Sequence, residues 1–229
     1  MKPLAQIERR YELKLVTPET GISVVRSWIR LHPGGFRTAF PPRRVNSIYL
    51  DTPGYRNLSE NLAGIENRQK LRLRWYGTLS SVVENPVLEI KIKEAQMGHK
   101  KQEKLNGSLD LTSNWKDVLS LAKTAVPPSF LPILKQHSQP TIINSYQREY
   151  YVTPDQQIRL TLDFDQRVFD QRLSMMPNWK RPLPIEKELV IELKAPQNQT
   201  DRITDIMGHF PLLRSRNSKY VKGMMSGPR

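Results

Sequence analysis

The chain contains no cysteine among its 229 residues. A disulfide scaffold, a thiolate zinc site and a cysteine nucleophile are therefore excluded. Its histidines, His32, His99, His137 and His209, are too far apart in sequence to form the paired pattern of a histidine metal site. No apolar run reaches the roughly 18 residues that a membrane-spanning helix needs. The N-terminus lacks the apolar segment of a signal peptide, so we expect a cytoplasmic protein without a membrane span.

Negative charge is scarce. The chain has 22 aspartate and glutamate residues against 36 lysines and arginines, which gives a formal net charge of +14. Charged residues make up 25% and hydrophobic residues 38% of the chain, so its composition is that of a folded domain rather than a disordered one. The cationic excess indicates an anionic partner, which could be nucleic acid, anionic lipid or a phosphate-rich small molecule.

Charged and apolar residues alternate with a period of two in several segments, for example in residues 10–15 and 70–75. Such alternation is typical of strands with one apolar and one charged face. We predict strands at about 7–16, 45–51, 68–77, 86–94, 145–152, 157–165 and 187–195. The fold class is then mainly β, within the α+β class.

Helical spacing of apolar residues is found in fewer places. It predicts helices at 18–31, 114–124, 128–137 and 201–209, while two segments rich in proline, glycine or arginine are predicted loops, at 32–44 and 174–187. The strands before residue 95 and after residue 145 resemble each other. We therefore expect a single domain over 1–229, with one sheet and a helical insertion at about 112–138.

The charged strand faces carry cations in i,i+2 pairs, such as Arg72 with Arg74 and Lys91 with Lys93, and few carboxylates are apparent opposite them. A solvated sheet face is one explanation. The recurrence of such faces favours another, because like charges on neighbouring strands repel unless an anion lies between them. If the sheet closes on itself, the charged faces line a tunnel that would hold a polyanion, with a divalent metal bridging it to glutamate or aspartate.

The order of these segments resembles a known family, the triphosphate tunnel metalloenzymes of the CYTH-like superfamily, and within it the VTC domain. The matching pieces run along nearly the whole chain: RYELKL at 10–15, NSIYLDTP at 46–53, KLRLRWYG at 70–77, LEIKIK at 88–93, YQREYY at 146–151, IRLTLDFD at 158–165, VIELK at 190–194 and SKYVKG at 218–223.

The resemblance implies an antiparallel eight-stranded β-barrel tunnel with peripheral helices. It also implies a polyphosphate polymerase-like enzyme that transfers the γ-phosphoryl group of ATP to a growing polyphosphate chain, with Mn²⁺ or Mg²⁺. The residues that match phosphate-binding positions are Lys14, Arg72, Arg74, Lys91, Arg148, Arg159, Arg216, Ser218 and Lys219. Of these, four are expected to act in catalysis: Arg72, Arg74, Lys91 and Lys219. Glu192 matches the metal-binding carboxylate, and Glu12 and Asp163 are further candidate ligands.

The chain departs from the superfamily at its first strand. The usual ExExK pattern is replaced by Arg10-x-Glu12-x-Lys14, so one carboxylate is missing. This loss favours phosphoryl transfer to another phosphate over hydrolysis, although Glu8 could compensate. Eukaryotic VTC proteins attach this domain to an SPX domain and a membrane part, neither of which is found in these 229 residues, so we expect a stand-alone version.

Other interpretations remain open for the whole chain and for single residues. The chain could be an inorganic triphosphatase of the same fold, or a non-catalytic module that binds polyphosphate or nucleic acid. A specific nucleic-acid partner is not expected, because aromatic residues such as Trp75 alternate to the side opposite the arginine pairs. Glu192 could be an ion-pair partner, and Asp163 and Asp165, on one face with Arg159, could be internal counter-charges. The segment 100–104 is expected to be a solvated or mobile loop.

Overall fold

The computed structural model describes residues 10–94 and 97–227 of the chain. An eight-stranded sheet in which all neighbours are antiparallel forms the centre, in the order β1-β10-β9-β8-β2-β3-β5-β6. Its strands are β1 Arg10–Pro18, β2 Arg37–Asp51, β3 Arg68–Tyr76, β5 Val87–Glu94, β6 Met97–Lys104, β8 Gln139–Val152, β9 Arg159–Asp170 and β10 Glu188–Pro196. Strands β4 Val82–Glu84 and β7 Ser108–Asp110 form a separate two-stranded sheet.

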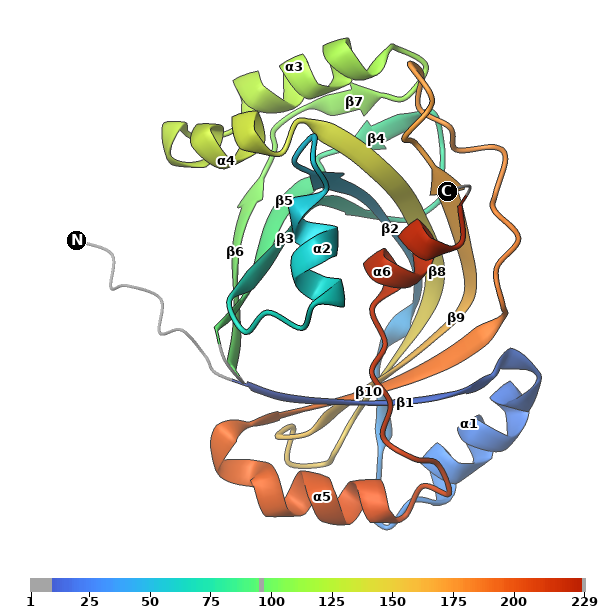
Figure 1. The fold of residues 1–229 in the computed structure, drawn as a ribbon. Coiled ribbons are helices and arrows are strands. Elements are labelled where there is room, and N and C mark those ends of the chain that lie inside the picture. Colours follow the sequence, from blue (N-terminus) through green and yellow to red (C-terminus); the bar gives the residue numbers. More distant parts are fainter. Residues whose placement is uncertain (1–9, 95–96, 228–229) are drawn as a thin grey trace.

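Helices surround the curved sheet, as Figure 1 shows. They are α1 Ile22–Leu31, α2 Arg56–Leu62, α3 Trp115–Ala125, α4 Leu131–Gln136, α5 Thr200–Gly208 and α6 Lys219–Met225, and three short 3₁₀ turns accompany them at Glu19–Gly21, Pro128–Phe130 and Gln197–Gln199. None of the helices within the described ranges is long and apolar enough to cross a membrane.

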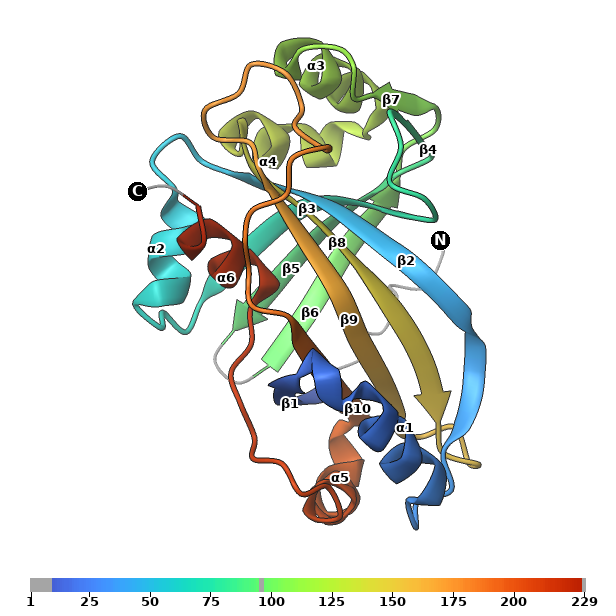
Figure 2. The ribbon, with the colours of Figure 1, turned by 90° about the vertical axis from the view of Figure 1, so that its right-hand side faces the viewer.

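The apolar faces of the strands pack into separate cores that the helices complete. Helices α3 and α4 cover the core of β2, β3 and β5, whereas α1 and α5 cover that of β1, β9 and β10. A smaller core lies under α6, where Tyr220 and Met224 pack against Tyr49 and Ile142 of the sheet. Helices α2 and α6 lie side by side at one end of the sheet (Figure 2).

The strand register places opposite charges next to each other on the face that the outer cores leave free. Three cross-strand pairs lie directly opposite each other: Lys14 and Glu192, Arg72 and Glu89, and Arg148 and Asp163. Side chains in such pairs are close enough to interact. The predicted alternation of an apolar and a charged face is therefore confirmed, but the charged face carries more carboxylates opposite its arginines than we expected.

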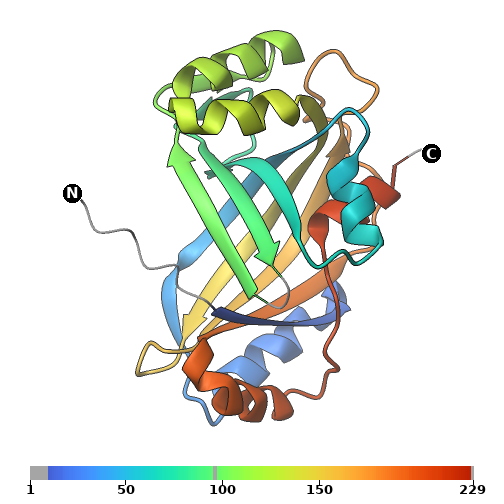
Figure 3. The ribbon, with the colours of Figure 1, turned by 60° about the vertical axis from the view of Figure 1, so that its left-hand side comes forward.

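The structure does not show the predicted closure of the sheet into a barrel. Strands β1 and β6 are its two edges, and no hydrogen-bonded ladder joins them within residues 10–94 and 97–227. The edges nevertheless lie near each other, as Figure 3 shows. A side-chain contact spans the gap, since Lys91 Nζ of β5 lies 3.1 Å from Glu12 Oε2 of β1. The structure is an α+β fold with an open, strongly curved antiparallel sheet.

Several segments differ from the sequence prediction, among them three near the charged strands. Strand β2 begins at Arg37, inside the predicted loop 32–44, because a register shift between Phe40 and Arg43 accommodates Pro41 and Pro42. The predicted loop 100–104 belongs to β6, whose lysines make it a charged edge strand. Helix α2 was not predicted because it has only seven residues and little apolar periodicity. Residues 7–9 of the first predicted strand lie outside the described residues.

Candidate phosphate-binding site

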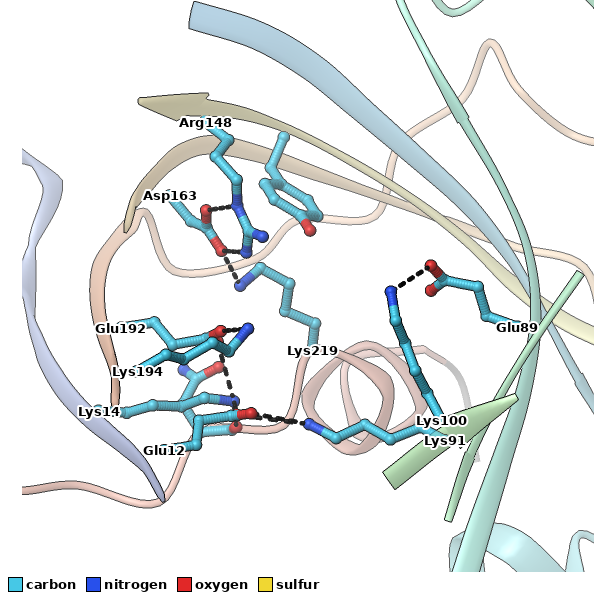
Figure 4. Close-up of polar contacts among 12 residues, drawn as sticks. Glu12, Lys14, Glu89, Lys91, Lys100, Arg148, Asp163, Glu192, Lys194 and Lys219 are labelled. Atoms are coloured by element: carbon cyan, nitrogen blue, oxygen red, sulfur yellow. Dashed lines mark hydrogen bonds and ion pairs between the residues drawn. The ribbon is translucent and has the colours of Figure 1, made fainter. Parts of the chain in front are cut away.

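Charged side chains from seven strands and from α6 converge on the free face of the sheet. Figure 4 labels ten of these residues, among them Lys219, which projects from the start of α6 toward the strands. We call this set the charged face. It consists of Glu12, Lys14, Lys70, Arg72, Arg74, Glu89, Lys91, Lys100, Arg148, Asp163, Glu192, Lys194 and Lys219.

Asp163 is the centre of the first group on this face. Arg148 binds it in a bidentate manner, with Nε 2.5 Å from Oδ1 and Nη2 2.7 Å from Oδ2, and Lys219 Nζ lies 2.6 Å from Oδ2. Burial alone would raise the pKa of Asp163, but the charges of Arg148 and Lys219 hold it below its usual value. Both cations also lie over the ring of Tyr146, with Lys219 Nζ 4.6 Å from the centroid.

A second group joins β1, β10 and β5. Lys14 Nζ lies 3.0 Å from Glu12 Oε1 and 3.4 Å from Glu192 Oε2, so the two carboxylates converge on one ammonium group. Glu192 also forms an ion pair with Lys194. Burial and the Glu192 carboxylate would raise the pKa of Glu12, but Lys91, Lys14 and Lys194 lower it to about 2. Burial would also raise the pKa of Glu192, but the positive charges of Lys194 and Lys14 outweigh this effect and lower the pKa.

The third group surrounds Glu89 of β5. Arg72 Nη2 lies 2.6 Å from Glu89 Oε2 and donates from Nη1 to the Tyr49 hydroxyl at 3.2 Å. Arg74 Nη1 lies 3.5 Å from the same Glu89 oxygen, and Lys100 Nζ lies 3.5 Å from Oε1. Burial opposes ionisation of Glu89, but Arg72, Arg74 and Lys100 lower its pKa to about 2. One carboxylate thus holds three cations in place.

Lys70 connects the sheet to α6. Its Nζ donates to Ser218 Oγ at 2.9 Å, and Ser218 Oγ in turn caps α6 by accepting from the backbone N–H of Val221. Burial, with added repulsion from Lys91 and Lys14, lowers the pKa of Lys70 to about 7. No carboxylate within the described ranges forms an ion pair with Lys70, so it is a cation of this face that an anion would stabilise.

The structure brings together most of the residues predicted for the site. Lys14, Arg72, Arg74, Lys91, Arg148, Ser218, Lys219, Glu12, Asp163 and Glu192 all lie on or beside the charged face. Two predicted phosphate ligands lie apart from them. Arg159 shares the face by register, but its side chain is exposed at the start of β9, and Arg216 is exposed in the segment before α6. Both would meet a ligand only at the rim.

Asp165 does not share a face with Asp163 and Arg159, so that prediction is wrong. A register shift between β8 and β9 and a φ of 45° at Asp165 turn this residue to the other face, where it pairs with Arg44. Glu8, which was expected to compensate for the missing carboxylate of β1, lies outside the described residues.

Several residues on or beside the charged face were not predicted as site residues: Tyr49, Lys70, Glu89, Lys100, Tyr146 and Lys194. Lys70, Glu89 and Lys194 each lie two residues from a predicted site residue on the same strand and therefore on the same face. This spacing could have identified them. The positions of Tyr49 and Tyr146 depend on how β2 pairs with β3 and β8, which the sequence alone does not specify.

The carboxylates of the charged face are the residues that could bind a divalent cation. No group of three or more histidine, aspartate or glutamate residues in the described part of the chain is arranged to hold a metal ion. Glu12 and Glu192 nevertheless both reach one cation, the Lys14 ammonium group. Mg²⁺ in phosphate-binding sites takes one or two carboxylates and completes its shell with water and phosphate oxygens. The residues therefore fit a cation that arrives with a phosphate ligand.

Comparisons with known proteins identify the fold and the family of the chain. Two solved structures are among those that share the fold. The Hippeastrum protein HpAC1, described as an adenylyl cyclase with a dominant triphosphatase activity, matches with a TM-score of 0.55 and 14% identity, over 95% of each chain. A candidate adenylate cyclase from Vibrio parahaemolyticus matches with a TM-score of 0.54 and 13% identity, over 97% of this chain and 100% of that one.

These identities are low, so the two structures show the fold alone. A search among curated protein sequences found no match. The VTC domain family, in contrast, matches residues 9–227, which is nearly the whole chain. The chain belongs to the VTC domain family and has the fold of the triphosphate tunnel metalloenzymes.

Proposed function

We propose that the protein transfers the γ-phosphoryl group of ATP to inorganic polyphosphate. In this reaction a terminal oxygen of the acceptor chain attacks the γ-phosphorus, the bond from that phosphorus to the β–γ bridging oxygen breaks, and ADP leaves with that oxygen. The acceptor becomes one phosphate longer. Such a transfer requires mainly positioning and neutralisation of charge from the protein.

The gathering of guanidinium and ammonium groups on one sheet face is the observation that supports this proposal. Arg72 and Arg148 present planar forks that suit phosphate oxygens, and Lys219 reaches between them from α6. In the structure these cations are paired with Glu89 and Asp163. A triphosphate would compete for them and offer more negative charge than the carboxylates do.

The low basicity of the carboxylates favours phosphoryl transfer over hydrolysis. A water nucleophile is helped by a base whose pKa is near the working pH. Glu12 and Glu89, with pKa values of about 2, are weak proton acceptors, and the pKa values of Asp163 and Glu192 are also lowered. A polyphosphate acceptor already carries a negatively charged oxygen and needs no base.

Mn²⁺ or Mg²⁺ would be held by Glu192 and Glu12, with Asp163 nearby on the next strand. When bound, such an ion would neutralise charge on phosphate oxygens. Lys14, which both glutamates now contact, would then turn its ammonium group toward the phosphates. Lys91 would bind the same ligand from the β5 side.

Product analysis tests the proposed function. Purified protein is incubated with ATP and Mn²⁺, and the products are separated on a polyacrylamide gel that resolves polyphosphate by length. We expect ADP together with chains much longer than three phosphates. The Arg148→Ala variant should make none, whereas Arg167→Ala, which removes an exposed arginine outside the charged face, should resemble the wild type. Orthophosphate as the sole phosphate product would establish a triphosphatase instead, and no turnover would leave a binding module.

A further inference from the structure

An arginine surrounded by three aromatic rings lies beside the charged face. The Cζ atom of Arg43 is 4.8 Å from the ring centroids of both Tyr76 and Tyr150 and 5.7 Å from that of Phe40. Phe40 and Tyr150 meet edge to face, with centroids 5.9 Å apart. We call these four residues the aromatic cluster.

The aromatic cluster is open to solvent. Phe40 is 58% and Tyr76 49% exposed, and the side chain of Arg43 is also exposed. No carboxylate in residues 10–94 and 97–227 pairs with Arg43, so its guanidinium group lies against aromatic side chains rather than an acidic partner. If the rings belonged to a hydrophobic core, other side chains would cover them, but Phe40 and Tyr76 are exposed. If Arg43 belonged to an ion-pair network, a carboxylate would contact it, and none does within the described residues. The flat faces of the rings are therefore available to a planar ligand.

The aromatic cluster continues the charged face along its strands. Tyr76 follows Arg74 by two residues on β3, and Tyr150 follows Arg148 by two residues on β8, so each ring lies on the same side of the sheet as its arginine. Arg43 is the direct cross-strand neighbour of Arg148. The start of β2 and the end of β8 lie at the opposite side of the sheet from α2 and α6 (Figure 2). The expectation that aromatic residues avoid the arginine side holds for Trp75 but not for Tyr76.

We propose that the aromatic cluster binds the nucleobase of a nucleoside triphosphate whose phosphates lie on the charged face. The base stacks on the exposed ring of Tyr76 or Phe40 and on the planar guanidinium of Arg43, in the manner of the stacking platforms that bind single bases. The ribose spans the step from Arg148 to the aromatic cluster. This inference rests on the proposed function only in that the phosphates occupy the charged face. The inference fixes the orientation of the bound nucleotide: its base lies on the aromatic cluster, away from α6, and its phosphates point toward Lys219 of α6.

Calorimetric titration with two ligands, ATP and inorganic tripolyphosphate, tests this inference at one salt concentration and with Mg²⁺ present. Loss of a stacking ring should weaken ATP binding by about tenfold, which corresponds to about 1.4 kcal/mol. We therefore expect Tyr76→Ala to raise the Kd for ATP about tenfold and to leave the Kd for tripolyphosphate within twofold of the wild type. Tyr76→Phe should retain ATP binding.

Two further variants keep the test specific. Arg43→Lys keeps the positive charge but removes the planar group, so it should also weaken ATP selectively, and it serves if Tyr76→Ala fails to fold. Tyr11→Ala removes a tyrosine that is 37% exposed on the other face of β1, and it should change neither affinity.

The outcomes separate the inference from the proposed function. Equal changes for both ligands, no change for either, or tripolyphosphate binding without ATP binding would overturn the inference and leave the phosphate site intact. Failure of the wild-type protein to bind either ligand would overturn both the inference and the proposed function.

Discussion

At the scale of single residues, each acidic side chain on the charged face contacts more than one cation. Asp163 holds Arg148 and Lys219, and Glu89 holds Arg72 and Arg74. These shared contacts keep the cations ordered without a ligand, which lowers the entropic cost of binding one. They also make the acidic residues competitors of the phosphate, so removing one carboxylate should affect binding and turnover in different ways.

The first prediction separates these two effects at Glu192. Glu192→Gln keeps the size of the side chain but removes a negative charge next to Lys14 and Lys194. We expect the variant to lose metal affinity by at least the roughly 10–100-fold seen for outer-shell changes, and its metal-dependent turnover with it. Tripolyphosphate binding at low salt should remain or become tighter.

Metal titration followed by turnover and calorimetry checks this prediction. Glu186→Gln, which alters an exposed glutamate just before β10, is the matched control and should behave as the wild type. Full metal-dependent activity of Glu192→Gln would show that Glu12 or Asp163 is the residue that holds the ion.

The second prediction concerns the pH dependence of binding through Lys70. Its pKa of about 7 in the free protein means that it is largely neutral at pH 8. A nearby phosphate favours the charged form, so the pKa rises in the complex and binding takes up a proton. The affinity for tripolyphosphate should therefore fall as the pH rises above about 7. Below that pH Lys70 is charged with and without the ligand, so its contribution to binding is complete and no longer changes with pH.

Comparison of variants isolates the contribution of Lys70 from the protonation of phosphate itself. Calorimetry from pH 6 to 9 in buffers of different ionisation enthalpy measures the proton uptake directly. Lys70→Gln should bind more weakly at pH 6 and show a flatter profile. Lys101→Gln, which changes an exposed lysine of β6, should keep the wild-type slope, and the same slope in Lys70→Gln would contradict the assignment.

Most of the site could be predicted at this scale, because alternation shows which residues of a strand share a face and the resemblance to the VTC domain selects among them. Lys14, Arg72 and Glu192 lie on such faces and match positions of that family. Tyr49 contacts Arg72 only through the pairing of β2 with β3, and Asp165 changes face at a bulge. Alternation within one strand contains no information on either.

At the scale of elements, α6 brings its own cation to a face otherwise built from strands. Tyr220 anchors the helix by donating from its hydroxyl to Asp51 at 2.5 Å and by stacking on Tyr49. A Cβ atom at Gly223 would lie 2.6 Å from Ile142, so only glycine allows the helix this close to β8. The SKYVKG motif at 218–223 covers the N-cap and most of this helix. The sequence analysis assigned Ser218 and Lys219 of the motif to phosphate binding and did not predict that Tyr220 anchors the helix.

The third prediction compares two lysines of α6. Lys219 contacts Asp163 on the charged face, whereas Lys222 donates to Glu188 at 2.6 Å and is more exposed. Loss of one charge-assisted contact costs about 1.5–3 kcal/mol. We expect Lys219→Ala to weaken triphosphate binding by roughly 10–100-fold and to abolish most turnover, and Lys222→Ala to have a much smaller effect.

Equilibrium binding of tripolyphosphate and turnover with ATP, both at low salt, check this comparison. Point variants are preferable to removal of the segment from Arg214 onward, because Tyr220 and Met224 are buried and their loss would disturb folding. Equal losses for both variants would show that α6 contributes only general positive charge.

Strands in which apolar and charged residues alternate clearly were predicted well. Strands that form only because they pair with a particular neighbouring strand were not. Strands β3, β5 and β10 alternate clearly and were identified close to their bounds. The first half of β2 contains two prolines that normally exclude a strand, and only its pairing with β8 across a register shift makes it one. Strand β6 is an edge of the described sheet and pairs with β5. Edge strands are often rich in charged residues, and such a sequence resembles that of a loop.

At the scale of the whole molecule, curvature brings the two sheet edges together without a ladder between them. Lys91 and Glu12 span the gap by an ion pair that is partly exposed and therefore weak. A polyanion lying against both strands would replace this contact with several stronger ones. The net charge of +14 also favours binding of a polyanion, because it raises the local concentration of anionic ligands and accelerates their association at low ionic strength.

The central claim is that the charged face holds the phosphates of a nucleoside triphosphate, and a crystal structure with a non-hydrolysable ATP analogue tests it most directly. We predict the three phosphates between Arg72, Arg148 and Lys219, with Glu89 and Asp163 released from at least one of their present ion pairs. Phosphates bound elsewhere, for example in the cavity lined by His32 and Arg202 beside α5, with the ion pairs of the charged face unchanged, would contradict the account.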